Sequence, residues 1–587
     1  ARNEEKFLSS DMPSILRSNP TRFWQLLSPK YHSQSLSLRD SNEDPIVESE
    51  SATALNDFFI SVFTDGGLGE VASPRLLSSA IMLPIVMSSA GISALIDKLK
   101  LSSSAGMDNI STKILKSTHI VASEYLSLIF SQSLSDRQSP KDWKIGKIIP
   151  VHKSGDRSLV SNYRPISLTS VPSKLLEHII SSNIISHLNS INVFCPHQHG
   201  FRKGLSCETQ LAEFTHDLLV NMNNNYQTDV IFLDFAKAFD RVSHRHLLTK
   251  LSVLGIDSTI IAWIQDFLTS RVQFTLANDH KSPLGKVASG VPQGAGLSPL
   301  LFLIYINDLP HDILSKIRLF ADDCVIYRPL TNDSDHLILQ DDLTQINTWC
   351  EQWLMPLNLD KCKVVSFTRR KTTDTYLYSL GGTPINTSSS YKYLGVNLTS
   401  SLSWVPHVDN IIAEASRTLG YLKRNLKSAP GHLKKLAYIT FVRPKLEYAS
   451  SFWHPSQAYV SDNLERIQTR AARFIASAYT HDISVTQLKE TLELPLLSSR
   501  RLNSRLCLLH KFYYNYPYSH TTPLAPPDRV SSRLNHSQSI KRIAGKTLAF
   551  NTSFFPHAIA IWNSLPDDIV VITDPIRFCQ EISLHNH

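Results

Sequence analysis

The chain has 587 residues, which is too long for one hydrophobic core and predicts roughly two to four subdomains. Hydrophobic residues make up 42% of the chain and charged residues 19%, as in an ordinary globular protein. The net charge of +8 allows a polyanionic partner but does not establish one. The seven cysteines are scattered and form no Cys-x-x-Cys pair, which argues against a disulfide framework and a structural zinc site and favours a reducing compartment.

The N-terminal part is expected to hold short helices and linkers. The chain starts at Ala1 without a Met or a signal peptide, so we expect it to be a fragment of a longer product. Phe23 and Trp24 anchor a predicted short helix, residues 31–50 are polar enough for a linker, and residues 55–63 have helical apolar spacing.

An uncharged segment, Leu76–Ile96, has the length of a membrane span. Its serines, one proline and one glycine make it too polar and too interrupted for that role, so we predict a loop followed by a buried helix. The helix is expected over Ile92–Leu101, before a loop at Ser102–Asp108.

A basic strand–turn–strand is predicted between Lys144 and Leu168, with Lys153 and Arg157 in its glycine-containing turn. Arginine can clamp phosphate oxygens with a fork of N–H groups and lysine adds a point charge, so this hairpin suits a phosphate-binding flap. An ordinary basic hairpin is the alternative. A helix is expected from about Ser173 to Leu188.

A buried strand is predicted over Asp229–Phe235, after a basic turn at Gly200–Gly204 and a helix from about Cys207 to Met222. Asp234 lies at the exit of this strand. Because a strand fixes a side chain while the adjoining loop stays open, this is a favourable place for an active-site carboxylate. Asp240 is expected to cap the helix that begins near His244.

A glycine-rich turn comes next along the chain. Residues 247–270 favour two helices, and Gln273–Ala277 with Lys286–Ala288 favour paired strands. They lead into Ser289–Leu300, which opens into an apolar helix over Leu300–Ile306. Such a turn at a helix N-terminus exposes backbone N–H groups to a ligand, although three glycines alone are weak evidence.

Two adjacent carboxylates, Asp322 and Asp323, are predicted at the tip of a hairpin formed by Leu319–Ala321 and Cys324–Tyr327. Two like charges at one tip are unfavourable unless cations neutralise them, so divalent metal binding is the functional interpretation. A lone Asp-Asp pair is more often a solvated turn, so this interpretation depends on support from elsewhere in the chain. Together with Asp234 they supply the carboxylates that two-metal phosphoryl transfer needs, with ions about 3.5 to 4 Å apart.

Seven motifs in this order resemble the reverse transcriptases of non-LTR, LINE-type retrotransposons, most closely the Jockey-like and chicken-repeat-like groups. They are Asn162–Leu168, Gly200–Arg202, Leu233–Asp240, Gly290–Gly294, Ser298–Leu309, Phe320–Asp323 and Tyr391–Gly395. The resemblance continues through Leu446–Ser450 and Phe554–Leu565, so it covers the chain from about residue 55. The hairpin has Phe-Ala-Asp-Asp where the family more often has Tyr-Ala-Asp-Asp, which keeps an aromatic ring.

The resemblance implies an α+β right-hand polymerase. The expected parts are N-terminal helices and a linker over 1–90, fingers and palm over 91–395, a helical thumb over 396–480, and a helical and loop-rich region over 481–587. The implied activity is RNA-directed DNA polymerisation with two Mg²⁺ ions, for which Mn²⁺ can substitute. The implied partners are an RNA template, a DNA primer or target and dNTPs, in target-primed copying.

The same resemblance implies a nuclear location, and we expect that an upstream endonuclease is missing from this fragment. The cysteine spacing and the interrupted Leu76–Ile96 segment argue against structural zinc and against a membrane. Two other functions stay open. A viral RNA-dependent RNA polymerase shares the palm, although an aromatic gate at Phe239 opposes it, and an inactive RNA-binding remnant would keep the fold without the activity.

Site residues follow by position in the motifs. The metal-binding, catalytic carboxylates would be Asp234, Asp322 and Asp323, with Lys361 as a general acid for pyrophosphate or else a surface lysine. Phe239 would exclude the ribose 2′-hydroxyl. The other nucleotide-binding residues would be Lys153, Arg157, Arg164, Phe235, Gln293 and Gly294, and the primer grip Tyr393, Leu394 and Gly395.

A basic segment spans residues 411–445, with eight Lys or Arg against one acid, Glu414. On helices this suits contact with a nucleic-acid backbone, and a solvated helix face is the alternative. The predicted contacts are Lys423, Arg424, Lys427, Lys434 and Lys435, and Arg466, Arg470 and Arg473 continue them on one helical face.

Overall fold

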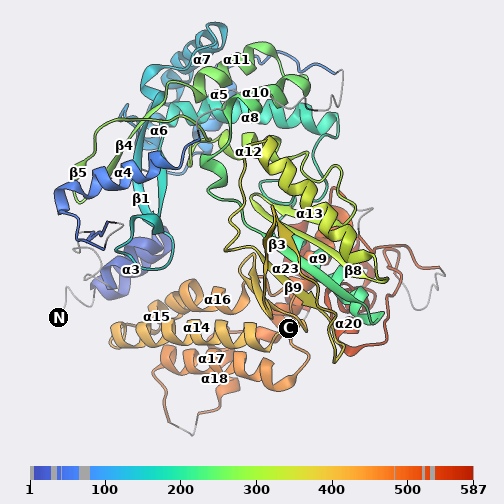
Figure 1. Cartoon of the computed structure of the whole chain (residues 1–587). Coiled ribbons are helices and arrows are strands. Elements are labelled where there is room, and N and C mark those ends of the chain that lie inside the picture. Colours follow the sequence, from blue (N-terminus) through green and yellow to red (C-terminus); the bar gives the residue numbers. More distant parts are fainter. Residues whose placement is uncertain are drawn as a thin grey trace.

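The protein is described by a computed structural model, which combines helices with two larger sheets (Figure 1). It describes residues 6–27, 36–40, 43–64, 74, 80–102, 104–480, 483–518, 522–528 and 536–585. The linker predicted over 31–50 and the segment predicted over 76–96 therefore lie partly outside the described residues. The boundaries predicted between subdomains stay predictions.

A central five-stranded sheet has the strand order β12-β9-β3-β8-β7. Strand β3 lies in the middle, antiparallel to β8 and β9, and β7 is antiparallel to β8. The strands are β3 (Gln227–Leu233), β7 (Lys316–Phe320), β8 (Asp323–Leu330), β9 (Lys363–Phe367) and β12 (Asn386–Thr387). The predicted buried strand and the predicted hairpin are both confirmed.

The two faces of the central sheet bury two different hydrophobic cores. Along β3, Val230 and Phe232 belong to one core, whereas Ile231 and Leu233 belong to the other. This follows from the two-residue period of a strand, and it explains why β3 is apolar at consecutive positions. The sheet is therefore fixed from both sides.

One core lies under helices from the first 352 residues of the chain. These are α5 (Ser89–Lys98), α7 (His119–Ser135), α8 (Val171–Ser190), α10 (His244–Val253), α11 (Ser258–Leu268), α12 (Ser298–Ile306) and α13 (Asp335–Gln352) (Figure 1). The sequence predicted α8, α10, α11 and α12 to within a few residues. Of the described helices, none has the length and the apolar character that crossing a membrane requires.

A second sheet carries the predicted basic hairpin, with β1 (Ile145–His152) antiparallel to β2 (Tyr163–Leu168). On its other side β1 pairs in parallel with β4 (Val272–Ala277), and β4 pairs with β6 (Gly285–Lys286). Helix α4 (Ser51–Ser61) packs on β4, where the Thr275 hydroxyl donates to Asn56 Oδ1 at 3.1 Å. The predicted basic hairpin, β1 with β2, and the predicted pair of strands before the glycine-rich turn, β4 with β6, are both confirmed.

The basic segment lies on a separate group of helices next to the central sheet (Figure 1). They are α14 (Val405–Asn425), α15 (Gly431–Ala437), α16 (Arg443–Glu447), α17 (Ala458–Ala476) and α18 (Val485–Thr491). The predicted aromatic helix, α3 (Pro20–Leu27), packs here, with the Trp24 ring 5.0 Å from that of Tyr421. The N-terminal helix thus contacts a segment almost 400 residues away in sequence.

The C-terminal helices pack beside α9 (Cys207–Asn223), on the same core as one face of the central sheet. They are α19 (Leu497–Tyr514), α20 (Leu548–Asn551), α21 (Phe554–Trp562), α22 (Asp567–Val570) and α23 (Pro575–His585). Residues far apart in sequence therefore share one core with β3 and β8.

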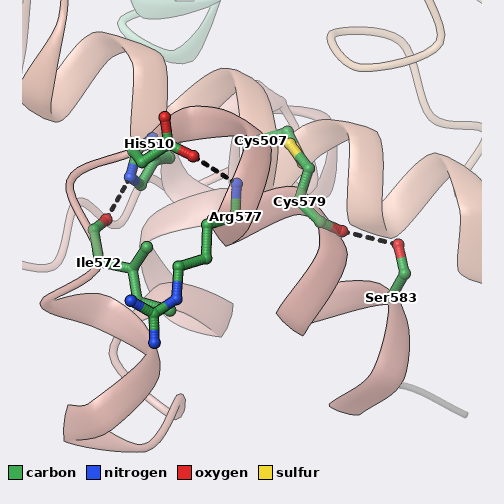
Figure 2. Close-up of a disulfide and its surroundings, with 7 residues drawn as sticks. Cys507, His510, Ile572, Arg577, Cys579 and Ser583 are labelled. Carbon is green, nitrogen blue, oxygen red and sulfur yellow. Dashed lines mark hydrogen bonds between the residues drawn. A yellow bond between two sulfur atoms is a disulfide. The ribbon is translucent and has the colours of Figure 1, made fainter.

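A disulfide joins α19 to α23 through Cys507 and Cys579, as Figure 2 shows. Beside it, His510 Nε2 lies 2.6 Å from the carbonyl oxygen of Ile572. The expectation drawn from cysteine spacing was wrong for this pair. The two cysteines are 72 residues apart, and the packing of the helices brings their Cα atoms to 5.8 Å, which spacing alone does not reveal.

Candidate active site

Three carboxylates gather at one end of the central sheet. The β3–β8 ladder ends with Leu233 opposite Cys324, so Asp234 and Asp323 are the next residues on two adjoining strands. Asp322 belongs to the two-residue turn that joins β7 to β8. The register thus brings together carboxylates that are 88 residues apart in sequence.

The carboxylates influence one another's protonation. Burial raises the pKa of Asp323 to about 6, and the neighbouring charges of Asp322 and Asp234 add to the effect. Burial also raises the pKa of Asp322, with a further contribution from Asp234. A concentration of negative charge that opposes its own ionisation favours a bound cation.

A cation already lies beside this cluster, because Lys361 Nζ is 3.4 Å from Asp234 Oδ2. Within the described ranges, no three His, Cys, Asp or Glu side chains are arranged as a complete metal site. The donor set nevertheless fits hard divalent ions, since the side chains offer carboxylate oxygens and their mutual repulsion is relieved by positive charge. Asp234, Asp322 and Asp323 are the residues that could hold such ions.

Basic side chains surround the carboxylates. Burial lowers the pKa of Lys153, as do the charges of Arg164 and Lys361, whereas Asp234 and Asp322 raise it. The hairpin of β1 and β2 therefore brings its basic residues into the field of the metal-binding candidates. Arg157 is exposed in the turn, where its carbonyl oxygen accepts the Tyr163 hydroxyl at 2.7 Å.

Sequence reasoning missed one cation, Lys237. Burial lowers its pKa, while the charge of Asp240 raises it and the charges of Lys153 and Lys361 lower it further. Lys237 takes a left-handed backbone conformation with φ of 54° in the loop after β3. Its position between two motif residues, Asp234 and Phe239, was the signal that could have identified it.

Phe239 lies in a short 3₁₀ turn, Ala238–Asp240, five residues after Asp234. Its ring stacks on Phe302 of α12 with centroids 4.5 Å apart and meets the edge of Phe201 at 6.2 Å. Stacking on a buried ring fixes its orientation. Phe235, in contrast, is 4% exposed, so its side chain belongs to the core and does not suit the predicted nucleotide contact.

The glycine-rich turn is docked on β2. Ser167 N donates to the carbonyl oxygen of Gln293 at 2.8 Å, and a Cβ on Gly294 would lie 2.6 Å from Ser167 O. Gln293 Nε2 donates to Asp240 Oδ1 at 2.9 Å. Asp240 therefore accepts from Gln293, and the predicted helix cap at this residue is wrong because Ser243 occupies the cap position of α10.

Two N–H groups just before α12 already have a partner within the protein. Gly296 N and Leu297 N donate to Glu177 Oε2 at 2.6 and 3.1 Å. The expectation that this turn offers its N–H groups to a ligand is wrong for these two groups. The carboxylate comes from α8, more than 100 residues earlier, so the turn's own sequence does not reveal it.

The predicted primer grip is the turn between β13 (Ser390–Tyr393) and β14 (Val396–Thr399). Tyr393 is 2% exposed, and its hydroxyl accepts from Gln210, so its side chain anchors the turn. Leu394 and Gly395 have φ of 45° and 83° at the tip. The Tyr448 hydroxyl donates to Leu394 O at 3.0 Å.

The predicted backbone contacts differ in exposure. Lys423 and Arg424 end α14, and Arg424 and Lys427 are exposed. Lys434 is 3% exposed, and its ammonium donates to Ser477 Oγ at 2.9 Å, which does not suit a phosphate contact. Lys435 pairs with Glu493 at 2.9 Å.

Comparison with known proteins agrees with this geometry. Residues 151–398, which include β2, β4 and all three carboxylates, match the family model described as reverse transcriptase (RNA-dependent DNA polymerase). The chain is therefore similar to the reverse transcriptases of jockey-like non-LTR retrotransposons. The match covers less than half of the chain, and the helices after residue 398 lie beyond that family model.

Three relatives illustrate the similarity. In Drosophila melanogaster, the "Probable RNA-directed DNA polymerase from transposon BS" is 29% identical over 65% of this chain and 43% of the relative. The "RNA-directed DNA polymerase from mobile element jockey" of the same species is 32% identical over 55% and 36%. Its Drosophila funebris counterpart is 28% identical over 66% and 43%. The chain thus spans less than half the length of these relatives.

The charge cluster predicts a pH-dependent stability. Because burial raises the pKa of Asp323 from 3.8 to about 6, the metal-free fold loses stability progressively as pH rises between these two values. Asp323→Asn should therefore raise the melting temperature in EDTA, and the gain over wild type should be small near pH 4 and larger at pH 8. Thermal denaturation across this range measures the gain. A gain that does not change with pH would contradict the assignment.

Proposed function

We propose that this reverse transcriptase is an RNA-directed DNA polymerase that extends a DNA 3′-hydroxyl on an RNA template. The observation that carries the proposal is the meeting of Asp234, Asp322 and Asp323 at one end of the central sheet, surrounded by basic side chains. Carboxylates with cations on the triphosphate side are what nucleotidyl transfer by two metal ions requires.

The chain's residues would divide the chemistry among them. When bound to the three carboxylates, two Mg²⁺ ions, or Mn²⁺ in their place, would activate the primer hydroxyl and neutralise the pyrophosphate. Arg164 and Lys153 would bind the triphosphate oxygens, with Lys237 as a further cation. Lys361 would protonate the leaving pyrophosphate, a role that fits its position beside Asp234.

The architecture would be that of a right hand. The second sheet and its helices would form the fingers, the central sheet the palm, and α14–α18 the thumb. Lys423, Arg424 and Lys427 would contact the backbone of the primer–template duplex, and Leu394 and Gly395 would hold the primer terminus. In this family's mode, copying would start at a nicked chromosomal 3′ end in the nucleus, with the nick supplied by an endonuclease outside this chain.

A homopolymer assay tests the proposal. Purified protein should incorporate dTTP on poly(rA) primed with oligo(dT) in Mg²⁺ or Mn²⁺, and incorporation should stop in EDTA. Incorporation that persists in EDTA would overturn the metal assignment. A protein that binds primed RNA but incorporates nothing with either ion would instead be an inactive RNA-binding remnant.

Phe239 distinguishes this function from RNA-dependent RNA polymerisation. Because the ring is held by Phe302, it would exclude the ribose 2′-hydroxyl by steric contact. Phe239→Val should therefore raise rUTP incorporation relative to dTTP about 10- to 100-fold, measured as the ratio of the two kcat/KM values. Phe239→Tyr keeps the ring and should keep the discrimination. Wild-type preference for rUTP would favour the RNA polymerase instead.

A further inference from the structure

An irregular segment, His197–Gly200, lies along the open edge of the central sheet beside β7. His197 O accepts from Leu319 N, and His199 N donates to Leu319 O, both at 2.9 Å. Gln198 and Leu319 form a parallel bridge. The segment therefore adds one more short strand beside β7. Strand β7 in turn leads directly into the Ala321–Asp322 turn.

The side chain of Gln198 continues this pairing onto the turn itself. Its Oε1 accepts from Ala321 N at 2.9 Å and from Gly200 N at 2.8 Å. Its Nε2 donates to Ala321 O at 3.3 Å. Both polar groups of the Gln198 carboxamide thus form hydrogen bonds with Ala321, the residue immediately before Asp322. The Gln198 side chain is buried, at 3% exposed.

The turn needs this support. Ala321 has φ of 54°, a left-handed conformation that costs a residue with a Cβ about 1 kcal/mol or more. The backbone of Gly200 packs directly against the same peptide, so closely that a Cβ on Gly200 would lie 2.2 Å from Ala321 N. The unfavourable conformation is therefore held in place by contacts from a segment more than 100 residues earlier in the chain.

We infer that Gln198 is a positioning residue for nucleotidyl transfer: it holds the Ala321 peptide so that the Asp322 carboxylate is fixed for metal binding. This inference rests on the proposed function. Gln198 itself touches neither substrate nor the reacting groups in this assignment. Its effect is transmitted through one peptide unit, whose displacement would move Asp322 relative to Asp234.

Gln198→Met tests the inference, since methionine has a similar size but makes none of the three hydrogen bonds. We expect kcat for dTTP incorporation to fall about 10- to 100-fold, because small displacements in an active site cost factors of this order. The KM for dTTP should change little. Gln198→Glu keeps the acceptor for Ala321 N and Gly200 N, so it should retain more activity than Gln198→Met.

Metal binding gives a second readout that does not depend on activity. In a thermal-shift titration with Mn²⁺ alone, Gln198→Met should require a higher Mn²⁺ concentration for half of the shift than wild type does. Equal Mn²⁺ dependence together with wild-type kcat would overturn the inference. An inactive wild-type protein would count against the proposed function, while the Mn²⁺ titration would still decide the role of Gln198 in metal binding.

Gln340 provides a matched control. Its Nε2 donates to Ser379 O at 3.0 Å and its Oε1 accepts from Ser379 N at 2.9 Å, so it clamps one residue through both polar groups as Gln198 does. It lies near the start of α13 and holds β10 (Ser379–Leu380); Asp335, the first residue of α13, pairs with Arg328 near the end of β8 opposite to Asp323. Gln340→Met should lower stability without changing kcat or Mn²⁺ dependence. An equal loss of kcat in both variants would show general destabilisation and would overturn the inference.

Discussion

Replacing Asp322 with asparagine is expected to reduce dTTP incorporation by a factor of about 10³ or more, in Mg²⁺ and in Mn²⁺. Asparagine has the same shape and keeps one oxygen, but it lacks the negative charge that a divalent ion needs. Asp322 belongs to the carboxylate cluster, since burial and the charge of Asp234 both raise its pKa. Single-nucleotide extension of oligo(dT) on poly(rA) measures the loss.

The same variant should show a gain in stability when no metal is present. Removing one of three like charges relieves repulsion, so the melting temperature of Asp322→Asn in EDTA should be higher than that of wild type. Asp279→Asn is the control, because Asp279 is exposed in the turn after β4 and its φ of 60° suits asparagine. It should leave incorporation unchanged. Full activity of Asp322→Asn would contradict the metal assignment.

The parts of the site that the sequence predicted are those governed by local rules. The apolar run before Asp234 predicts a strand buried on both faces, and the alternation of Val230, Ile231, Phe232 and Leu233 between two cores bears this out. The hairpin around Asp322 follows from turn chemistry between two apolar runs. The order of the family motifs then predicted that Asp234 and the Asp322–Asp323 hairpin lie together, as the β3–β8 register places them.

The parts that could not be predicted depend on contacts between distant segments. Glu177 accepts from two N–H groups just before α12, and Lys434 is buried against Phe474 of α17 and Ser477 at the end of that helix. Gln198 has no local signature of its role, because its partner Ala321 lies 123 residues later. A basic or polar residue in sequence can be exposed, paired or buried, and only the tertiary structure decides between these states.

The second variant with a large expected effect is Arg318→Met, which disrupts a buried ionic network that includes Arg318 of β7. Arg318 is 7% exposed, and its guanidinium donates to Glu213, to Asp217 Oδ2 at 2.8 Å and to Tyr327 Oη at 2.8 Å. Burial alone would raise the pKa of Asp217, but the charges of Arg318 and Lys316 lower it to about 2. The network is thus held together by one buried cation.

Arg318→Met should therefore destabilise the protein by about 3 to 5 kcal/mol, because it removes the buried cation that pairs with Glu213 and Asp217. The shift of the urea unfolding midpoint, with its slope, measures the loss. Arg328→Met on the neighbouring strand β8 is the matched control. Arg328 donates to Asp335 at 2.7 Å, but its side chain is 23% exposed and Asp335 keeps the N–H groups of Thr331 and Asn332, so the control should cost at most about 1 kcal/mol.

The network also extends to the C-terminal helices. The Tyr516 hydroxyl donates to Glu213 and lies 3.2 Å from His199 Nε2, which is adjacent to Gln198. Tyr516→Phe removes one hydroxyl and leaves every charge paired, so it should cost about 1 kcal/mol, far less than Arg318→Met. Equal losses in the two variants would contradict the central role of Arg318. A small but measurable loss in Tyr516→Phe would mean that the C-terminal helices, through Tyr516, help to stabilise β7, the edge strand that leads into the Asp322 turn.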